Sequence, residues 1–345
     1  MLFTEGLAVM VTSIVGAGVF GLPEFAKNLG WMSAFYLLLA YLFSILLARV
    51  VLSFTPGTLD EEFERAFGKK YGKLTELLDM VISLLALTAY IVGVQSHLQA
   101  NIFILLFFMF IPLMFHLHFP ASFSIGLTAV IVAFMTSLSF VNLKFAGGFP
   151  ATGFSPAFGG MLLAAAYFAF FGHNMIPRVR TIIQHTKEAW KAIIISFTAV
   201  FVLYALFTLT TIPIGGSGLS TVVLSRFYEG STPSTIALFA ALIFYTSFIL
   251  IGLHLQEKVG HTPRASLLTV VAALALYALT EIFSIPFSSI IASAGFAVSL
   301  YAVLAGVTAL KIRKKQKKGE RSSIIALLVL SGLPWLLLVL GSFLG

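Results

Sequence analysis

The stretch Val11-Thr-Ser-Ile-Val-Gly-Ala-Gly-Val-Phe-Gly-Leu-Pro23 is apolar, but glycine interrupts it and proline follows. Gly16 and Gly18, separated by one residue, weaken a helix, and Pro23 lacks the backbone donor that a helix interior uses. The stretch therefore predicts a helix that cannot stay continuous. Free backbone groups at membrane depth are tolerated only where they line a cavity or are buried in protein. Taken alone, the stretch is also compatible with a simple kink or a glycine face for close helix packing.

A second interrupted stretch, Tyr167-Phe-Ala-Phe-Phe-Gly-His-Asn-Met-Ile-Pro177, begins the second half of the chain. Gly172 precedes Pro177 by the same interval as Gly18 precedes Pro23. Two interrupted helices in corresponding positions of inverted halves point to a transporter binding site. At each break the upstream half presents unpaired carbonyls, and the downstream half presents N–H groups and a positive dipole end. Such a pair suits a zwitterion without any charged side chain.

The glycines Gly16, Gly18 and Gly21 also match the spacing of a dinucleotide-binding loop. That loop requires a preceding strand and a surrounding βαβ unit. Here the glycines lie inside an apolar segment long enough to cross a membrane, so we do not expect a dinucleotide site.

The composition excludes most soluble classes. Of the 345 residues, 59% are hydrophobic and only 10% are charged, against about 25% charged in ordinary globular domains. Disorder would require low hydrophobicity, and the absence of cysteine excludes disulfides and thiolate sites. The net charge of +8 lies in short loops between apolar segments, so we expect a membrane protein with no nucleic-acid partner.

Segments of about 20 apolar residues, each long enough to span a membrane as a helix, occur throughout the chain. Eleven are predicted, and residues 1–345 form a single transmembrane domain of all-α class. They cover residues 4–28, 31–54, 74–98, 100–117, 121–141, 157–182, 189–212, 232–255, 264–281, 286–310 and 323–344. The first is expected to be a retained span, because Met1–Phe3 lacks the basic region of a signal peptide.

The distribution of Lys and Arg predicts the orientation, because cytoplasmic loops are enriched in these residues. With the N-terminus in the cytoplasm, the positions outside are Lys27, Lys144 and Arg226, and the other 18 of the 21 lie inside. An odd number of spans then places the C-terminus outside. The basic run Lys311–Arg321 is interpreted as a loop beside anionic lipid, and the acidic segment Asp60–Glu64 as one face of a short cytoplasmic helix.

Ser13–Pro23 resembles the first-helix signature of the amino acid/auxin permease family, and Phe168–Pro177 resembles its sixth-helix signature. The aromatic amino acid permeases have similar motifs, and both families belong to the amino acid–polyamine–organocation superfamily. The chain departs from the family pattern in being short. It also has Ala26 one position later than the alanine that usually follows the first-helix proline.

The resemblance implies a transporter fold of five plus five helices. Its inverted repeats cover about residues 1–141 and 157–310, with broken helices 1 and 6 and a peripheral terminal helix over 323–344. It implies a symporter for a neutral amino acid in the plasma membrane, coupled to Na⁺ or H⁺, with no other cofactor and no enzymatic activity.

The resemblance also assigns site residues. The substrate carboxylate would meet the amides of Gly16, Ala17 and Gly18 near Ser13, and its amino group would meet carbonyls near Ile14. The predicted substrate-binding residues are Ser13, Ile14, Gly16, Ala17, Gly18, Tyr90, Phe168, Phe171 and Gly172. Phe168 and Phe171 are candidates for a lid over the substrate, and packing against lipid is an equal alternative for them. The Tyr90 hydroxyl could reach the substrate, and a hydrogen bond between helices is an equal alternative for it.

Two coupling ions remain open. The predicted Na⁺ site, a metal site of hydroxyl and carbonyl oxygens, consists of Thr12, Val15, Ile243, Thr246 and Ser247. The alternative for the hydroxyls is bonding to their own helix carbonyls. For protons, His173 is the candidate, because histidine titrates near neutral pH; packing is its alternative. Asp79 lies near a predicted helix end, where we expect it to snorkel to water.

Other functions receive less support. A membrane enzyme would need clustered carboxylates, a metal set or a phosphate loop, and the acidic residues are scattered. A channel would show a pore helix or a ring of like residues, and none is evident. A channel or a non-transporting membrane sensor remains the alternative to a symporter.

Overall fold

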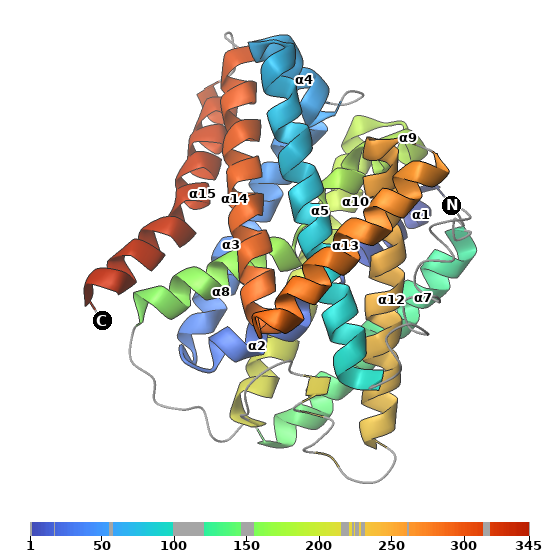
Figure 1. The fold of residues 1–345 in the computed structure, drawn as a ribbon. Helices are drawn as coiled ribbons and strands as arrows, with labels where there is room; N and C mark the ends of the chain where they lie inside the picture. The colour runs from blue at the N-terminus through green and yellow to red at the C-terminus, as the bar shows by residue number, and fades with distance from the viewer. Residues whose placement is uncertain are drawn as a thin grey trace.

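The computed structural model is helical throughout the part of the chain that it describes (Figure 1). The described residues are 2–16, 18–54, 58–98, 121–145, 155–214, 221–222, 224, 228, 232–260, 262–312 and 318–344. Within them, α-helices and short 3₁₀ turns account for the regular structure, and no strand is formed. The expected all-α class is confirmed.

The helices follow the apolar segments closely. Their bounds are α1 (Leu2–Ile14), α2 (Gly18–Ala26), α3 (Met32–Leu52), α4 (Leu59–Phe67), α5 (Lys69–Leu98), α7 (Ala121–Asn142), α8 (Pro156–Ala169), α9 (Ile176–Ile183), α10 (Thr186–Thr211), α12 (Thr232–Val259), α13 (Pro263–Ile282), α14 (Phe287–Ile312) and α15 (Lys318–Leu344). The 3₁₀ turns are η1 (Leu143–Phe145), η2 (His173–Met175) and η3 (Ile212–Ile214).

Nine segments of the described residues are long and apolar enough to cross a membrane, and the bent pair α1–α2 makes a tenth. These correspond to ten of the eleven predicted spans. The remaining one, residues 100–117, lies outside the described residues. The chain is therefore a multi-pass membrane protein.

Both predicted breaks are present. The axes of α1 and α2 differ by 50°, and residues Phe170–Gly172 with η2 separate α8 from α9. One detail differs from expectation, because Pro23 lies inside α2 and does not end it. The first break falls instead at Val15–Gly16, where the glycine-rich backbone no longer sustains the helix.

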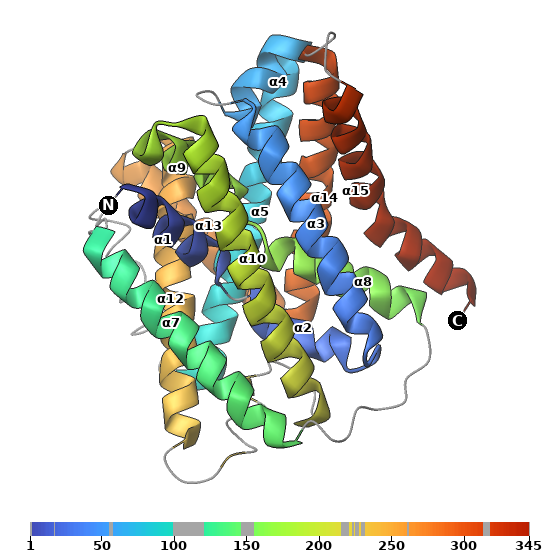
Figure 2. The same cartoon turned by 180° about the vertical axis from the view of Figure 1, so that it is seen from behind.

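The broken helices occupy the interior of the bundle, and the terminal helix lies on its edge (Figures 1 and 2). α8 packs against α14, α15, α2 and α3, while α1 packs against α10, α9 and α7. In the segment Pro156–Ile183, 78% of the residues in its most apolar window are buried, against 28% in α15. The interior position is what allows unpaired backbone groups at the breaks to be shielded from lipid.

Helix α4 confirms the expected short helix in the acidic segment. Thr58 caps it: the Thr58 side chain accepts a bond from the Glu61 amide, and the Glu61 carboxylate accepts one from the Thr58 amide. This reciprocal pair satisfies two donors at the helix start. α4 packs against α5 and α14, which places Asp60 beside the larger cavity described below.

Candidate functional site

The two breaks cross and touch at the centre of the bundle. A Cβ atom added at Gly18 would lie 2.4 Å from the Cα atom of Ala169. A Cβ atom at Gly172 would lie 2.7 Å from Cγ1 of Ile14 and 3.0 Å from Oγ of Ser13. Gly18 therefore allows a close approach of two backbones, and Gly172 leaves room for the side chains of Ile14 and Ser13.

Tyr204 of α10 ties the two breaks together. Its hydroxyl oxygen lies 2.8 Å from the carbonyl oxygen of Ile14 and 3.3 Å from that of Ala169, the last residues of α1 and α8. One buried hydroxyl group thus serves a carbonyl at the end of each upstream half-helix. Tyr204 could not be predicted from the sequence, since no motif surrounds it and a single tyrosine in an apolar span gives no periodic signal.

A small central cavity lies where the breaks meet. Seven of the nine predicted substrate-binding residues line it: Ser13, Ile14, Gly16, Gly18, Tyr90, Phe168 and Phe171. Gly172 adjoins it through Ile14 and Ser13, and Ala17 lies outside the described residues. The volume is about 10 Å³, about the space that one water molecule occupies, so the structure holds this cavity closed.

Polar and apolar groups divide the cavity wall. The hydroxyls of Tyr90 and Ser247 approach Gly16 on one side, at 3.0 and 3.2 Å from the position of an added Cβ atom. Ile82, Ala86 and Ile251 line it with the two phenylalanines. The cavity therefore offers backbone groups at the breaks, the hydroxyls of Ser13, Ser83 and Tyr90, and an otherwise apolar surface.

The residues of the predicted sodium site are only partly brought together. Ser247 donates to the carbonyl of Val15 at 3.4 Å. The Thr246 hydroxyl donates within its own helix, to Leu242 and Ile243 at 3.0 and 3.1 Å. Thr12 donates to the Ala8 carbonyl at 2.8 Å and meets the hydroxyl of Thr128 on α7. Among these five described residues, a hydrogen bond between the first break and α12 is made by Val15 and Ser247 alone.

His173, the predicted proton site, is fully buried. Its Nε2 atom lies 2.9 Å from the carbonyl oxygen of Ser44, and its ring packs between those of Phe171 and Phe197. Its Nδ1 atom has no hydrogen-bond partner among the described residues. The recorded surroundings of the imidazole are thus one carbonyl and two aromatic rings.

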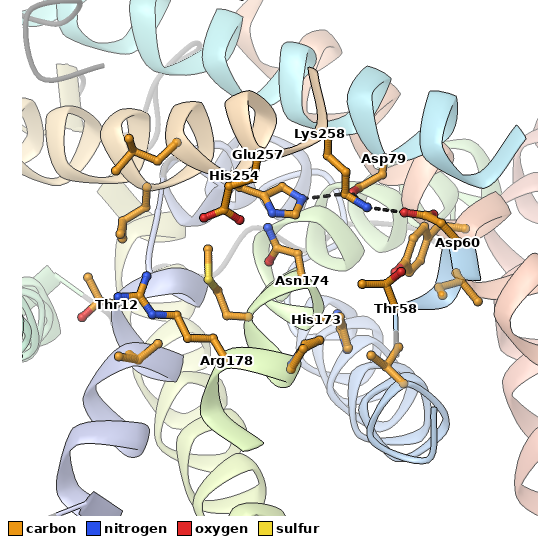
Figure 3. Close-up of a pocket in the computed structure, with 18 residues that line it drawn as sticks. Thr12, Thr58, Asp60, Asp79, His173, Asn174, Arg178, His254, Glu257 and Lys258 are labelled. Carbon is orange, nitrogen blue, oxygen red and sulfur yellow. Dashed lines mark hydrogen bonds and ion pairs between the residues drawn. The ribbon is translucent and has the colours of Figure 1, made fainter. Parts of the chain in front are cut away.

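A larger cavity of about 370 Å³, which we call the vestibule, adjoins the central cavity (Figure 3). Thr12 lines the vestibule, and its neighbour Ser13 lines the central cavity. The Phe171 and Tyr301 rings, one from each lining, meet edge to face with centroids 5.6 Å apart. This aromatic contact lies between the two cavities.

The vestibule carries a cluster of ionisable side chains from three helices. His254 Nε2 on α12 lies 2.9 Å from Asp79 Oδ2 on α5, and Lys258 Nζ lies 3.5 Å from the same oxygen. Lys258 also pairs with Asp60 of α4. Asp79 is therefore buried in an ionic cluster and does not snorkel to water; the prediction from its position near a helix end was wrong.

No group of three or more histidine, aspartate or glutamate side chains within the described residues has the arrangement of a metal site.

The sequence is similar to that of a plant transporter. The amino acid transporter AVT1H of Arabidopsis thaliana is 24% identical over 278 residues, which are 70% of this chain and 62% of that protein. The match therefore spans less than two thirds of the length of that relative. No protein-family model matches the chain.

Solved transporter structures share the fold. The manganese transporter of Eremococcus coleocola, in complex with an aromatic bis-isothiourea substituted compound, has a TM-score of 0.67 at 11% identity, covering 99% of this chain and 87% of that one. Mhp1, a nucleobase-cation-symport-1 family transporter in a closed conformation with bromovinylhydantoin bound, has a TM-score of 0.65 at 10% identity, covering 98% and 91%. These structures confirm the expected inverted-repeat transporter fold, and the similarity to a plant amino acid transporter agrees with the predicted resemblance to amino acid permeases.

Proposed function

We propose that this membrane protein is a secondary active transporter that moves a neutral amino acid by alternating access, coupled to a cation gradient. The observation that carries the proposal is the crossing of two interrupted helices around a closed cavity. Substrate sites of transporters with inverted repeats lie at such interruptions near the middle of the membrane. The similarity to a plant amino acid transporter supports the substrate class.

The wall of the central cavity supports a zwitterionic substrate with an apolar side chain. Backbone amides at Gly16 and Gly18 are the donors for a carboxylate, and carbonyls at Ile14 and Ala169 are acceptors for an ammonium group. Phe168 and Phe171 would contact the side chain. Because the Ile14 and Ala169 carbonyls already accept from Tyr204, we propose that the ammonium group joins or replaces that hydroxyl when the cavity expands.

We propose that the vestibule is the cytoplasmic half of the transport path. It is lined by Arg178 and Lys258, which the distribution of basic residues assigns to the inside. Separation of Phe171 from Tyr301 would then open the central cavity toward the cytoplasm. This orientation, with the N-terminus inside and the C-terminus outside in the plasma membrane, belongs to the proposal.

The transport function is tested by uptake of a radiolabelled amino-acid panel into proteoliposomes, with and without an inward Na⁺ gradient at equal pH. We expect saturable uptake of at least one neutral amino acid that unlabelled substrate inhibits. Uptake that does not saturate would support a channel, and binding without any uptake would support a sensor. If no amino acid is bound or moved, the substrate class is wrong.

Alanine substitutions at Ser247 and Thr246 provide a test of the sodium site and its matched control. We expect Ser247→Ala to lower transport about fivefold or more, because it removes a contact to the break that is worth about 1 kcal/mol or more. Thr246→Ala removes only a bond within α12, so we expect a change below about twofold. Initial rates measured over a range of Na⁺ and substrate concentrations provide the readout.

The response to Na⁺ separates the two coupling ions. If the double alanine variant loses a Na⁺ dependence that the wild type has, the sodium site is supported. The Thr246 hydroxyl bonds to carbonyls of its own helix. It therefore supports the sodium site less than a hydroxyl directed toward the break would. Equal defects in the two single variants would contradict the distinction drawn between them.

A further inference from the structure

We propose that His254 and Asp79 form the proton-binding site that couples transport to a proton gradient. The inference rests on the proposed transport function and assigns to this pair the role first predicted for His173. It is carried by the geometry of the pair, its access to water and the balance of charge in the vestibule.

The hydrogen bond fixes the nitrogen that would take the proton. Nε2 of His254 lies 2.9 Å from Oδ2 of Asp79, a carboxylate oxygen that can only accept while it is ionised. When Nε2 donates to this oxygen, the neutral imidazole keeps its lone pair on Nδ1. A proton from vestibule water would then bind Nδ1 and form an imidazolium paired with Asp79.

The pair lies at a boundary between water and protein. Both side chains line the 370 Å³ vestibule, yet only 10% of the His254 side chain and 5% of the Asp79 side chain are exposed. Oδ1 of Asp79 is buried and has no hydrogen-bond partner among the described residues. Water in the vestibule can therefore reach the pair, yet the pair is buried enough for one added charge to change its electrostatic energy strongly. His173 lacks both a recorded carboxylate neighbour and exposure.

The charged groups around the pair give the vestibule lining one more negative than positive charge when His254 is neutral. Facing the vestibule are Asp60 of α4, Asp79 of α5, Glu257 and Lys258 of α12, and Arg178 of α9. The other titratable groups in its lining are His173 of η2 and Tyr301 of α14, while α1 contributes the hydroxyl of Thr12 (Figure 3). Three carboxylates thus face two permanent cations, and a proton on His254 makes the described lining neutral.

Neutralisation provides a physical route to coupling. Closing the vestibule removes water from its lining, and an unpaired charge left in a dry interior is costly. The lining with neutral His254 carries an excess negative charge, so its closure is less favourable than closure with the proton bound. With the proton bound, every charge has a counterpart, and the equilibrium shifts toward the closed vestibule and the opposite opening. Proton binding and the conformational change are thereby linked.

The variant His254→Gln tests the proposal, because glutamine can still donate to Asp79 but does not titrate. Proteoliposomes without Na⁺ are compared with and without an acidic outside pH for accumulation of a labelled substrate. A gradient of one pH unit supports at most about tenfold accumulation with one proton per substrate. We expect wild-type accumulation to approach this bound. The variant, whose lining keeps its excess negative charge, should show no accumulation driven by the gradient and should exchange internal for external substrate more slowly than wild type.

Two other histidines serve as controls. His185 lies exposed before α10, so His185→Gln is expected to leave gradient-driven accumulation unchanged. His173→Gln is expected to keep its response to the proton gradient, even if packing changes lower the rate. Loss of the proton response in His173→Gln alone, or accumulation that requires Na⁺ and ignores pH, would overturn the assignment.

A second measurement is independent of the substrate. Because the chain contains no cysteine, Val9→Cys places a single thiol on the vestibule wall. Its labelling by a membrane-impermeant maleimide, normalised to a denatured sample at each pH, reports how open the vestibule is as the pH is varied. We expect labelling to rise with pH in the wild-type background and to lose this dependence with His254→Gln.

The two proposals can therefore fail separately. Exchange activity without any effect of His254→Gln on either measurement contradicts the proton site and leaves the transport function intact. The opposite outcome is that labelling depends on pH, that His254→Gln abolishes this dependence, and that the protein moves no amino acid. This outcome supports the proton-binding pair and contradicts the substrate class.

Discussion

Gly18→Ala is expected to lower amino acid uptake at least about 100-fold while the protein still inserts into the membrane. The added Cβ atom would lie 2.4 Å from the Cα atom and 2.7 Å from the Cβ atom of Ala169. Neither of these atoms belongs to a flexible side chain, so the two breaks must separate. Overpacking costs about 1–3 kcal/mol or more, and about 1.4 kcal/mol corresponds to tenfold in a rate or equilibrium. The measurement is initial uptake rate per inserted protein.

Gly126→Ala and Gly332→Ala are the matched controls. Both glycines lie inside long helices, in α7 and α15, and an added Cβ atom meets nothing within 4 Å at either position. Both variants should transport like wild type and gain slight helix stability, since alanine is the better helix former. Near-normal uptake by Gly18→Ala would show that the breaks do not carry the substrate in this arrangement.

Tyr204→Phe is expected to lower uptake about tenfold or more and to reduce thermal stability. Removing the hydroxyl takes a donor from two carbonyls at the ends of α1 and α8. Leaving a buried acceptor unsatisfied costs about 1–3 kcal/mol, and about 1.4 kcal/mol corresponds to tenfold in a rate. The melting temperature in detergent and the uptake rate are measured together.

Tyr41→Phe controls for the loss of a tyrosine hydroxyl. Tyr41 bonds the hydroxyl of Thr198 at 2.9 Å in an exposed position, and this pair joins α3 to α10. Its loss is expected to change stability and uptake little. If Tyr204→Phe behaves like Tyr41→Phe, the bridge across the breaks is not needed for transport.

The spans could be predicted because they depend on local properties. The helices Thr186–Thr211 and Phe287–Ile312, for example, each contain an apolar stretch long enough to cross a bilayer, and in lipid such a stretch must form a helix to satisfy its own backbone. The breaks at Gly16 and Gly172 were predictable for the same reason, since glycine weakens the helix within the segment itself.

Proline was a less reliable guide than glycine. Pro23 lies inside α2, whereas Pro177 lies in the first turn of α9, where its missing donor is not needed. Within the short helix α2, which surrounding helices pack against, the backbone hydrogen bond that Pro23 cannot donate is lost without ending the helix. Glycine therefore marked both breaks, and tertiary packing makes it necessary there, against the Ala169 backbone at Gly18 and against the Ile14 side chain at Gly172.

By itself, the sequence determined that the chain is helical and membrane-embedded, with two interruptions in corresponding places, because these follow from the length of apolar segments and the weakness of glycine in a helix. Only the tertiary structure decided which polar groups meet. Tyr204 reaches both breaks, Thr246 turns back on α12, and His254 finds Asp79 from a distant helix. Such contacts depend on the rotation and crossing of packed helices, and a single sequence carries no local signal for either.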